Sequence, residues 1–187
     1  MSNNDNQQFI NQKERIEVIF KKILRYDFYI NSTNAKASII IAWNGIVIGT
    51  ILLKYNSIIS LYRIPEWAYF ISNVLLSFIA LTSTISIILI FQVINPFLIL
   101  THKKDKDSKS LLFFGSVAKM SFDEYFQKES TTSYKEILSD LTEQSYILAN
   151  GLNNKMKNMQ RTIKVIFLQL LGLILLILLR GVIIYAL

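Results

Sequence analysis

Residues 162–187 read TIKVIFLQLLGLILLILLRGVIIYAL, and this apolar stretch decides the fold class of the 187-residue chain. The hydrocarbon core of a bilayer is about 30 Å thick, so about 20 mostly apolar residues of helix can cross it. Two earlier stretches, residues 37–53 and 67–100, come close to that length or exceed it. The sequence therefore predicts an all-α membrane protein with three transmembrane helices.

The overall composition agrees with a membrane protein, because 52% of the residues are hydrophobic and the mean hydropathy is +0.37. The net charge of +7 would suit a nucleic-acid polymer, but the basic residues alternate with acidic ones and form no single stripe. No nucleic-acid polymer is therefore expected as a partner. The chain has no cysteine, which excludes disulfide bonds and thiolate chemistry.

The placement of lysine and arginine predicts the orientation. Six basic residues precede the first apolar stretch and eleven lie in residues 101–164, whereas the loop between the first two stretches has only Arg63, with Lys54 at its edge. Positively charged loops stay on the cytoplasmic side. We therefore expect a multi-pass membrane protein with a cytoplasmic N-terminus and an external C-terminus.

Four segments follow from this topology. Residues 1–36 form a cytoplasmic N-terminal tail and amphipathic helix, and residues 37–100 form two transmembrane helices with a short external loop. Residues 101–161 form a cytoplasmic helical sensing region, and residues 162–187 form the third transmembrane helix. Disorder is expected for the polar residues 1–8.

A cytoplasmic helical stalk is predicted from two amphipathic patterns. Around Ile19, apolar residues recur at helical spacing, with charged residues such as Lys22 on the opposite side. A second helix starts at Ser133, with Glu136 placed to complete a capping box. Its apolar seam steps by four and three residues and enters the third span without a proline. The seam residues are Tyr134, Leu138, Leu141, Ser145, Leu148, Leu152, Met156, Met159, Ile163 and Ile166.

Polar residues inside the apolar stretches are costly in lipid and often functional. One face of the second stretch carries Asn73, Ser77, Ala80 and Thr84, which serve either packing among the three spans or self-association. Arg180 either extends to the outer headgroups or lines a pathway. The other deep polar residues are Asn44, Gln92, Asn95 and Gln169.

Motifs of catalysis are missing from the sequence. There is no nucleophile elbow, Walker loop or dinucleotide-binding glycine pattern, and the acidic residues lack metal-site spacing. We therefore expect no enzyme activity, no metal and no cofactor.

Several strings of the sequence resemble one protein family. Residues 25–27 read RYD and residues 34–37 read NAKA; residues 113–126 read FFGSVAKMSFDEYF, and residues 136–149 read EILSDLTEQSYILA. Together they resemble the transmembrane effectors of Pycsar, the pyrimidine-cyclase antiphage system of bacteria, over about Arg25 to Leu179. The family usually has Asp-x-Lys-Ala before the first span, whereas this chain has Asn34 at the acidic position.

The resemblance implies a mechanism. A partner cyclase makes cyclic UMP or cyclic CMP on infection, and the effector, expected to be a homo-oligomer, responds by impairing the inner membrane and stopping the cell. A receptor for such a ligand needs cations for the phosphate and an aromatic surface for the base. The candidates for the phosphate are Arg25, Lys36, Lys119 and Lys155. Phe113, Phe114 and Tyr125 are candidates for stacking, Asn34, Ser121 and Gln144 for the base edge, and Gly115 for a close backbone approach.

Two other functions stay open at this point. The chain would also suit a membrane effector of another second messenger, such as a cyclic dinucleotide or oligonucleotide. It would also suit a structural membrane subunit without a ligand, in which the same aromatic residues only pack. A neighbouring cyclase gene would distinguish a sensor from a structural subunit.

Overall fold

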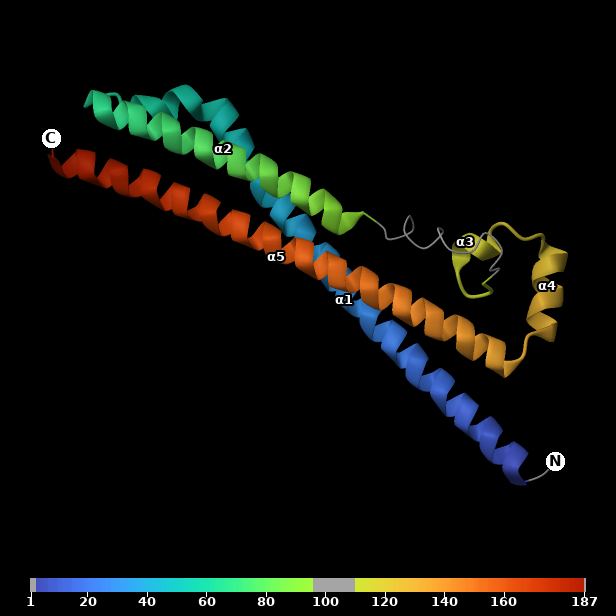
Figure 1. The fold of residues 1–187 in the computed structure, drawn as a ribbon. Helices are drawn as coiled ribbons and strands as arrows, with labels where there is room; N and C mark the ends of the chain where they lie inside the picture. The colour runs from blue at the N-terminus through green and yellow to red at the C-terminus, as the bar shows by residue number, and fades with distance from the viewer. Residues whose placement is uncertain (1–2, 96–109, 187) are drawn as a thin grey trace. The chain divides into compact units, whose positions relative to one another are not determined.

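The computed structural model describes the backbone of residues 3–95 and 110–186, and these residues form five helices and no strand, which Figure 1 labels in chain order. Three of the helices, α1, α2 and α5, are long and apolar enough to cross a membrane. The predicted all-α fold with three transmembrane helices is therefore confirmed. The helices are α1 (Asn3–Ser60), α2 (Glu66–Ile94), α3 (Phe114–Val117), α4 (Phe122–Thr131) and α5 (Tyr134–Ala186).

The helix boundaries agree with most of the sequence pattern. α2 begins directly after Pro65, and α5 runs from Tyr134 through the third apolar stretch without a break, as predicted. The expected disorder of residues 1–8 is wrong for residues 3–8, which are the first residues of α1. The end of the second apolar stretch and the start of the predicted sensing region, residues 96–109, lie outside the described part of the chain.

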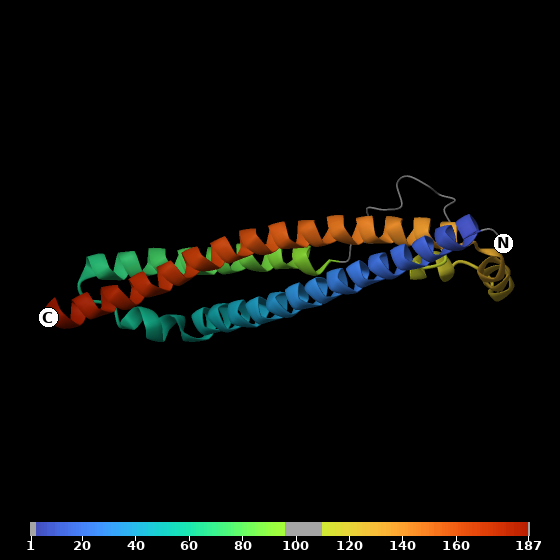
Figure 2. The same ribbon diagram turned by 90° about the horizontal axis from the view of Figure 1, so that it is seen from below.

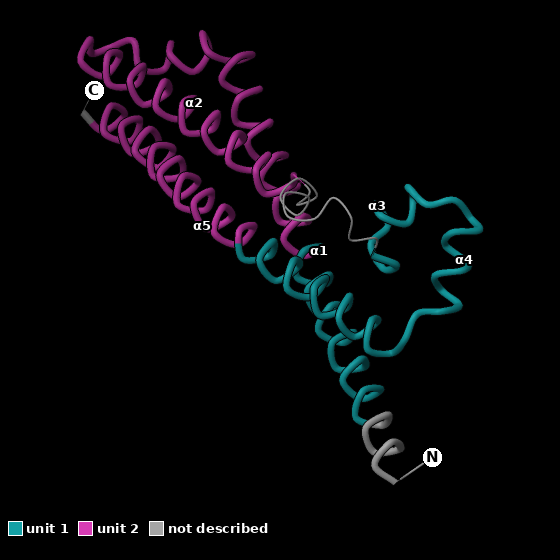
Figure 3. The backbone as a smooth tube through the Cα atoms, turned by 45° about the vertical axis from the view of Figure 1, so that its right-hand side comes forward, with its two compact units in different colours: residues 1–31, 96–153 teal, residues 32–95, 154–187 magenta. Residues whose placement is uncertain are grey.

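The chain forms two compact units, coloured separately in Figure 3. Unit 1 consists of Met1–Asn31 and Pro96–Asn153, and unit 2 consists of Ser32–Asn95 and Asn154–Leu187. Both α1 and α5 contribute residues to each unit. The two units therefore share two continuous helices.

In unit 1, hydrogen bonds to the Asp140 carboxylate hold the segment before α3 against the start of α5. The hydroxyl of Ser110 donates to the Asp140 carboxylate at 2.8 Å, and the backbone N–H groups of Leu111 and Leu112 reach the same carboxylate at 3.1 and 3.3 Å. The predicted capping box is confirmed, because the Ser133 N–H donates to Glu136 at 2.7 Å and the Glu136 N–H donates back to the Ser133 hydroxyl at 3.4 Å. Four backbone donors, at the start of this segment and of α5, are thereby satisfied.

Unit 2 is a three-helix bundle. Figures 1 and 2 show α2 running beside the second halves of α1 and α5. On α5 a buried residue recurs every seven positions, which is the repeat of a helix–helix seam. These residues are Lys155, Thr162, Gln169, Leu176 and Ile183. On α1 the matching face buries Thr33, Ala37, Asn44 and Val47.

This seam corrects part of the sequence prediction. Met156 and Ile163 were predicted to face the partner helix, but they are 43% and 52% exposed. The neighbouring Lys155 and Thr162 are buried in their place. The apolar pattern fails here because lipid is itself apolar, so apolar side chains lose nothing by facing outward while polar ones turn inward.

The packing face of α2 is also different from the predicted one. Ser72, Ser83 and Ser86 are fully buried, whereas Ser77 and Thr84 of the predicted face are exposed. Asn73 of that face accepts a hydrogen bond from Tyr55 of α1. Packing among the spans therefore uses mainly the adjacent serine face.

Arg180 has a protein partner at the far end of unit 2. Its guanidinium donates to the carbonyl of Leu61, directly after the end of α1. One residue further, the Tyr62 hydroxyl donates to the Leu176 carbonyl at 3.0 Å, and Tyr62 is only 4% exposed. Burial raises the pKa of Tyr62, and the nearby Arg180 opposes this. The α1–α2 turn is thus fastened to α5 by two hydrogen bonds.

Candidate functional site

Lys155 joins the three helices of unit 2 through hydrogen bonds. The residue is 3% exposed, and its ammonium donates to the Asn34 side chain at 3.2 Å, to the Val93 carbonyl, and to the Ile94 carbonyl at 3.5 Å. The two carbonyls are in the last turn of α2, where a helix leaves its carbonyls unpaired and carries partial negative charge. Lys155 therefore satisfies the C-terminal end of α2 from α5, with Asn34 of α1 as the third acceptor.

This environment changes the chemistry of Lys155. The residue precedes the third apolar stretch, and its burial lowers the pKa of the ammonium group. An ammonium has three donors, and three acceptors surround this one. A phosphate could bind Lys155 only by replacing some of these acceptors.

The other basic candidates lie on exposed surface. Lys36 and Lys119 are exposed. The Arg25 guanidinium lies over the Tyr29 ring, 5.7 Å from its centroid, and donates to the Tyr29 hydroxyl at 3.1 Å. That hydrogen bond raises the pKa of Arg25. Arg25 is thus held along the surface of α1.

Two of the aromatic candidates, Phe113 and Phe114, lie at the start of α3. The rings of Phe113 and Phe114 are 5.0 Å apart and tilted by 47°. A Cβ atom on Gly115 would lie 2.6 Å from the Phe113 ring, so a larger residue at this position would require the ring to move. Tyr125 is half-buried on α4.

Ser121 and Gln144 have local roles in unit 1. The Ser121 hydroxyl caps α4 by accepting from the Glu124 N–H at 3.3 Å. The Gln144 amide donates to the Ser110 hydroxyl at 3.4 Å, next to Asp140. Asn34, Lys36 and Lys155 belong to unit 2, and the other eight candidates belong to unit 1.

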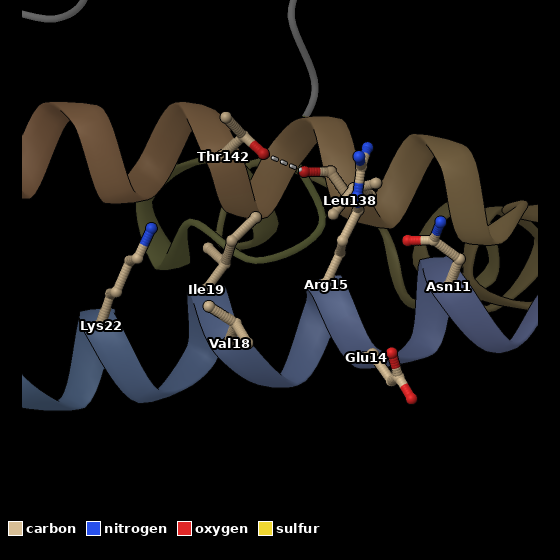
Figure 4. A pocket seen from close by; sticks show the side chains of 8 residues that line it. All are labelled: Asn11, Glu14, Arg15, Val18, Ile19, Lys22, Leu138 and Thr142. Atoms are coloured by element: carbon tan, nitrogen blue, oxygen red, sulfur yellow. Dashed lines mark hydrogen bonds between the residues drawn. The ribbon is translucent and has the colours of Figure 1, made fainter.

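A groove between α1 and α5 of unit 1 was missed by the sequence analysis. It encloses about 410 Å³, and Figure 4 shows its lining. The side chains of Arg15 and Lys22 extend from α1 toward α5, whereas Glu14 points away from α5. The lining residues are Asn11, Glu14, Arg15, Val18, Ile19, Lys22, Leu138 and Thr142.

The position of Lys22 contradicts the predicted pattern, which placed it opposite Ile19. Arg15 and Lys22 lie four residues before and three residues after Ile19, so all three share one face of the helix. The signal in the sequence was this spacing, which places cations on both sides of the apolar contact with α5. The groove offers two cations, apolar side chains from both helices, and polar groups at Asn11 and Thr142.

A second cavity, near α4 and the start of α5, has a mainly negatively charged lining, unlike the groove with its two cations. It measures about 710 Å³ and is lined by four carboxylates, those of Glu129, Glu136, Asp140 and Glu143, with Lys128 as the cation among its lining residues. Such a lining repels an anionic ligand. Of the two cavities, the α1–α5 groove therefore suits a phosphate. No cluster of three metal-ligating side chains occurs among the described residues.

The sequence of this chain matches a known protein family. The family model for the Pycsar effector protein domain matches residues 19–182, which is most of the chain. The chain belongs to the Pycsar effector family. No curated protein and no solved structure matches it significantly. Lys22, Leu138 and Thr142 of the groove lie within the matched residues, and Arg15 precedes them.

Membership confirms the predicted resemblance and the broad function. This Pycsar effector is a multi-pass membrane protein of antiviral defence that acts on a signal from a partner cyclase. The family is one of effectors and not a known catalytic family.

Proposed function

We propose that this Pycsar effector binds a cyclic pyrimidine mononucleotide, cyclic UMP or cyclic CMP, in the cytoplasm and then impairs the integrity of the inner membrane. The observation that carries the proposal is the family match over residues 19–182 on a chain with three membrane-length helices. The outcome for the cell would be abortive infection.

The groove between α1 and α5 is the proposed ligand site. Its volume of about 410 Å³ lies within the range of about 300–1,000 Å³ that small-molecule pockets occupy. Arg15 and Lys22 would bind the phosphate, because charge-assisted hydrogen bonds from cations to phosphate are strong. Ile19 and Leu138 would contact the base, and Asn11 and Thr142 would contact its polar edge.

The proposed orientation follows from the charges. Unit 1 contains twelve basic residues within residues 11–31 and 96–153, and such segments remain in the cytoplasm. The groove would then face the compartment in which a cyclase releases its product. The turn held by Tyr62 and Arg180, and the C-terminus, would lie outside.

We further propose that α5 transmits the signal. It is one helix from Tyr134 to Ala186, so a rotation at Leu138 propagates along the same backbone to Lys155. Lys155 would then leave the last carbonyls of α2 and loosen the bundle. A ligand shifts such an equilibrium only by its difference in affinity between the two states, which here means tighter binding to the groove of the loosened state.

Thermal unfolding of the detergent-purified protein tests the ligand and its site together. One site saturated at about 100 times its dissociation constant adds about 2.7 kcal/mol of stability. We expect a rise in Tm with cyclic UMP or cyclic CMP and none with cyclic AMP or cyclic GMP. Arg15→Ala and Lys22→Ala should lose the rise. Lys21→Ala should keep it, because Lys21 is exposed and pairs with Glu17 outside the groove.

Each contrary result has a definite meaning. A rise with cyclic dinucleotides alone would replace the proposed messenger. A pyrimidine-specific rise that survives Arg15→Ala and Lys22→Ala would move the site to another set of residues, such as those around Phe113. No rise with any nucleotide, in a folded protein, would favour a structural subunit without a ligand.

A further inference from the structure

Two amide side chains lie fully buried inside the apolar stretches of unit 2. Asn44 of α1 donates to the Ser86 hydroxyl of α2 at 3.1 Å and to the carbonyl of Ile40 at 2.9 Å. Gln169 of α5 donates to the Ser83 hydroxyl of α2 at 2.7 Å. Because Ser83 and Ser86 are three residues apart, both hydrogen bonds lie on one face of α2, within about one turn.

The oxygen atoms of both amides lack a hydrogen-bond partner in the described part of the chain. These atoms, Asn44 Oδ1 and Gln169 Oε1, are buried. An unsatisfied polar atom is costly at membrane depth, where no water is available to replace the partner. By contrast, the exposed hydroxyl of Thr84 has a hydrogen-bond partner, because it donates to the Ala80 carbonyl at 3.0 Å.

Gln169 continues a line of polar residues along α5. Lys155, Thr162 and Gln169 are buried and lie seven residues apart. At 1.5 Å per residue this line is about 21 Å long, roughly two-thirds of the hydrocarbon core. Leu176 and Ile183 continue the same seam as apolar residues, next to the buried Tyr62.

We propose that Asn44, Ser83, Ser86, Thr162 and Gln169 line the ion pathway of the active effector. Leu176 and Ile183 are buried in the core of the bundle, where they would form an apolar constriction that blocks ions by excluding water until the bundle loosens. When the bundle loosens, water enters and supplies hydrogen bonds to the two leftover oxygens. Amide oxygens and hydroxyl groups are neutral ligands that replace the hydration shell of small cations. The pathway therefore favours cations such as K⁺.

The inference rests on the proposed function, because it needs a ligand that opens the bundle. It differs from a role in helix packing alone. A packing role explains the bonds to Ser83 and Ser86, but it gives no reason to keep two amide oxygens without partners. If Gln169 lines an ion pathway, a charge at position 169 changes the ion selectivity of the current; if Gln169 only packs, it does not.

The test is the current through planar bilayers that contain the purified protein, a potassium chloride gradient and saturating cyclic UMP or cyclic CMP. Gln169→Glu should move the reversal potential toward the value for potassium, and Gln169→Lys should move it toward the value for chloride. Gln169→Leu should lose the current while it keeps the ligand-induced rise in Tm.

A second variant covers the case in which a charge at position 169 prevents folding. The chain has no cysteine, so Gln169→Cys provides one thiol without background. Cationic and anionic thiol reagents, added after the ligand, should shift the reversal potential in opposite directions. Thr84→Cys is the matched control, because Thr84 is an exposed polar residue of α2 beside Ser83, and the reagents should leave its current unchanged.

The outcomes separate the two proposals. If the wild type conducts but neither charged residues nor reagents at position 169 change the selectivity, the pathway is refuted and the effector function stands. If the wild type conducts nothing with any cyclic mononucleotide, both the effector function and the pathway are refuted.

Discussion

The contact between Asn34 and Lys155 gives a quantitative prediction. Asn34→Asp would place a carboxylate where the amide oxygen now lies, 3.2 Å from the ammonium nitrogen. By Coulomb's law with an effective dielectric constant of about 20, this pair gains about 5 kcal/mol. Removing the carboxylate from water offsets most of the gain. Since Asn34 is only half-buried, we expect a net stabilisation of about 1 to 2 kcal/mol.

The assay is a double-mutant cycle on thermal or denaturant unfolding in detergent. Asn34→Asp, Lys155→Met and the double variant are compared with the wild type, and the cycle isolates the pairwise energy. Asn34→Asp should stabilise the wild-type background. In the Lys155→Met background it should be neutral or destabilising, because the new carboxylate then has no cation. Equal stabilisation in both backgrounds would refute the assignment of this contact.

The same variant tests the proposed release of Lys155 on activation. If activation breaks the contact, a stabilisation of about 1.4 kcal/mol raises the ligand concentration needed for half-maximal response about tenfold. The apparent affinity of the groove in unit 1, measured by calorimetry in detergent, should fall by about the same factor, because the ligand then has to shift a more stable closed state. An unchanged response in a variant that is measurably stabilised would show that Lys155 keeps its contacts in the active state.

Three further predictions concern other contacts. Leu141→Asp should destabilise unit 1 and abolish the response to ligand, because Leu141 is only 8% exposed. Tyr146→Asp is the control: this position on the same helix is 71% exposed, so the variant should change neither the Tm nor the response. Tyr62→Phe should lower the unfolding free energy by about 1 kcal/mol because one buried hydrogen bond is lost; an unchanged Tm would contradict this. Hydrogen bonds from the backbone and side chain of Ser133 hold the pKa of Glu136 below its ordinary value of 4.5. Their stabilisation is therefore present above that value and disappears as the pH falls through the lower folded-state pKa, so acid should reduce the Tm advantage of the wild type over Glu136→Gln.

The sequence predicted the elements that depend on local signals. Ser133 and Glu136 marked the start of α5, and the absence of proline after Ser133 predicted one helix through the third span. In each case the deciding interactions lie within a few residues of one another. Length and hydropathy likewise sufficed to count the spans.

The sequence could not predict the buried faces inside the membrane. The apolar pattern selected Met156 and Ile163, whereas Lys155 and Thr162 are the buried residues. In water a helix buries its apolar face, but next to lipid the apolar residues can face outward and the polar ones need partners inside. The acceptors of Lys155 come from Asn34 and the end of α2, so sequence spacing alone could not identify them.

The groove was missed for a related reason. Arg15 contributed only to the predicted orientation, and Lys22 was placed on the charged side of the helix, because cations next to an apolar seam are usually exposed side chains. Their role as lining residues depends on where α5 lies, with Leu138 and Thr142 opposite. No local pattern in α1 contains that information.

The most direct test of the central claim is ligand-triggered release of a dye from liposomes that contain the purified protein. The account predicts release on addition of cyclic UMP or cyclic CMP, no release with cyclic AMP or cyclic GMP, and no release from liposomes with Arg15→Ala protein at the same ligand concentration. Intact liposomes with every cyclic nucleotide, in a preparation shown to be folded and inserted, would contradict it.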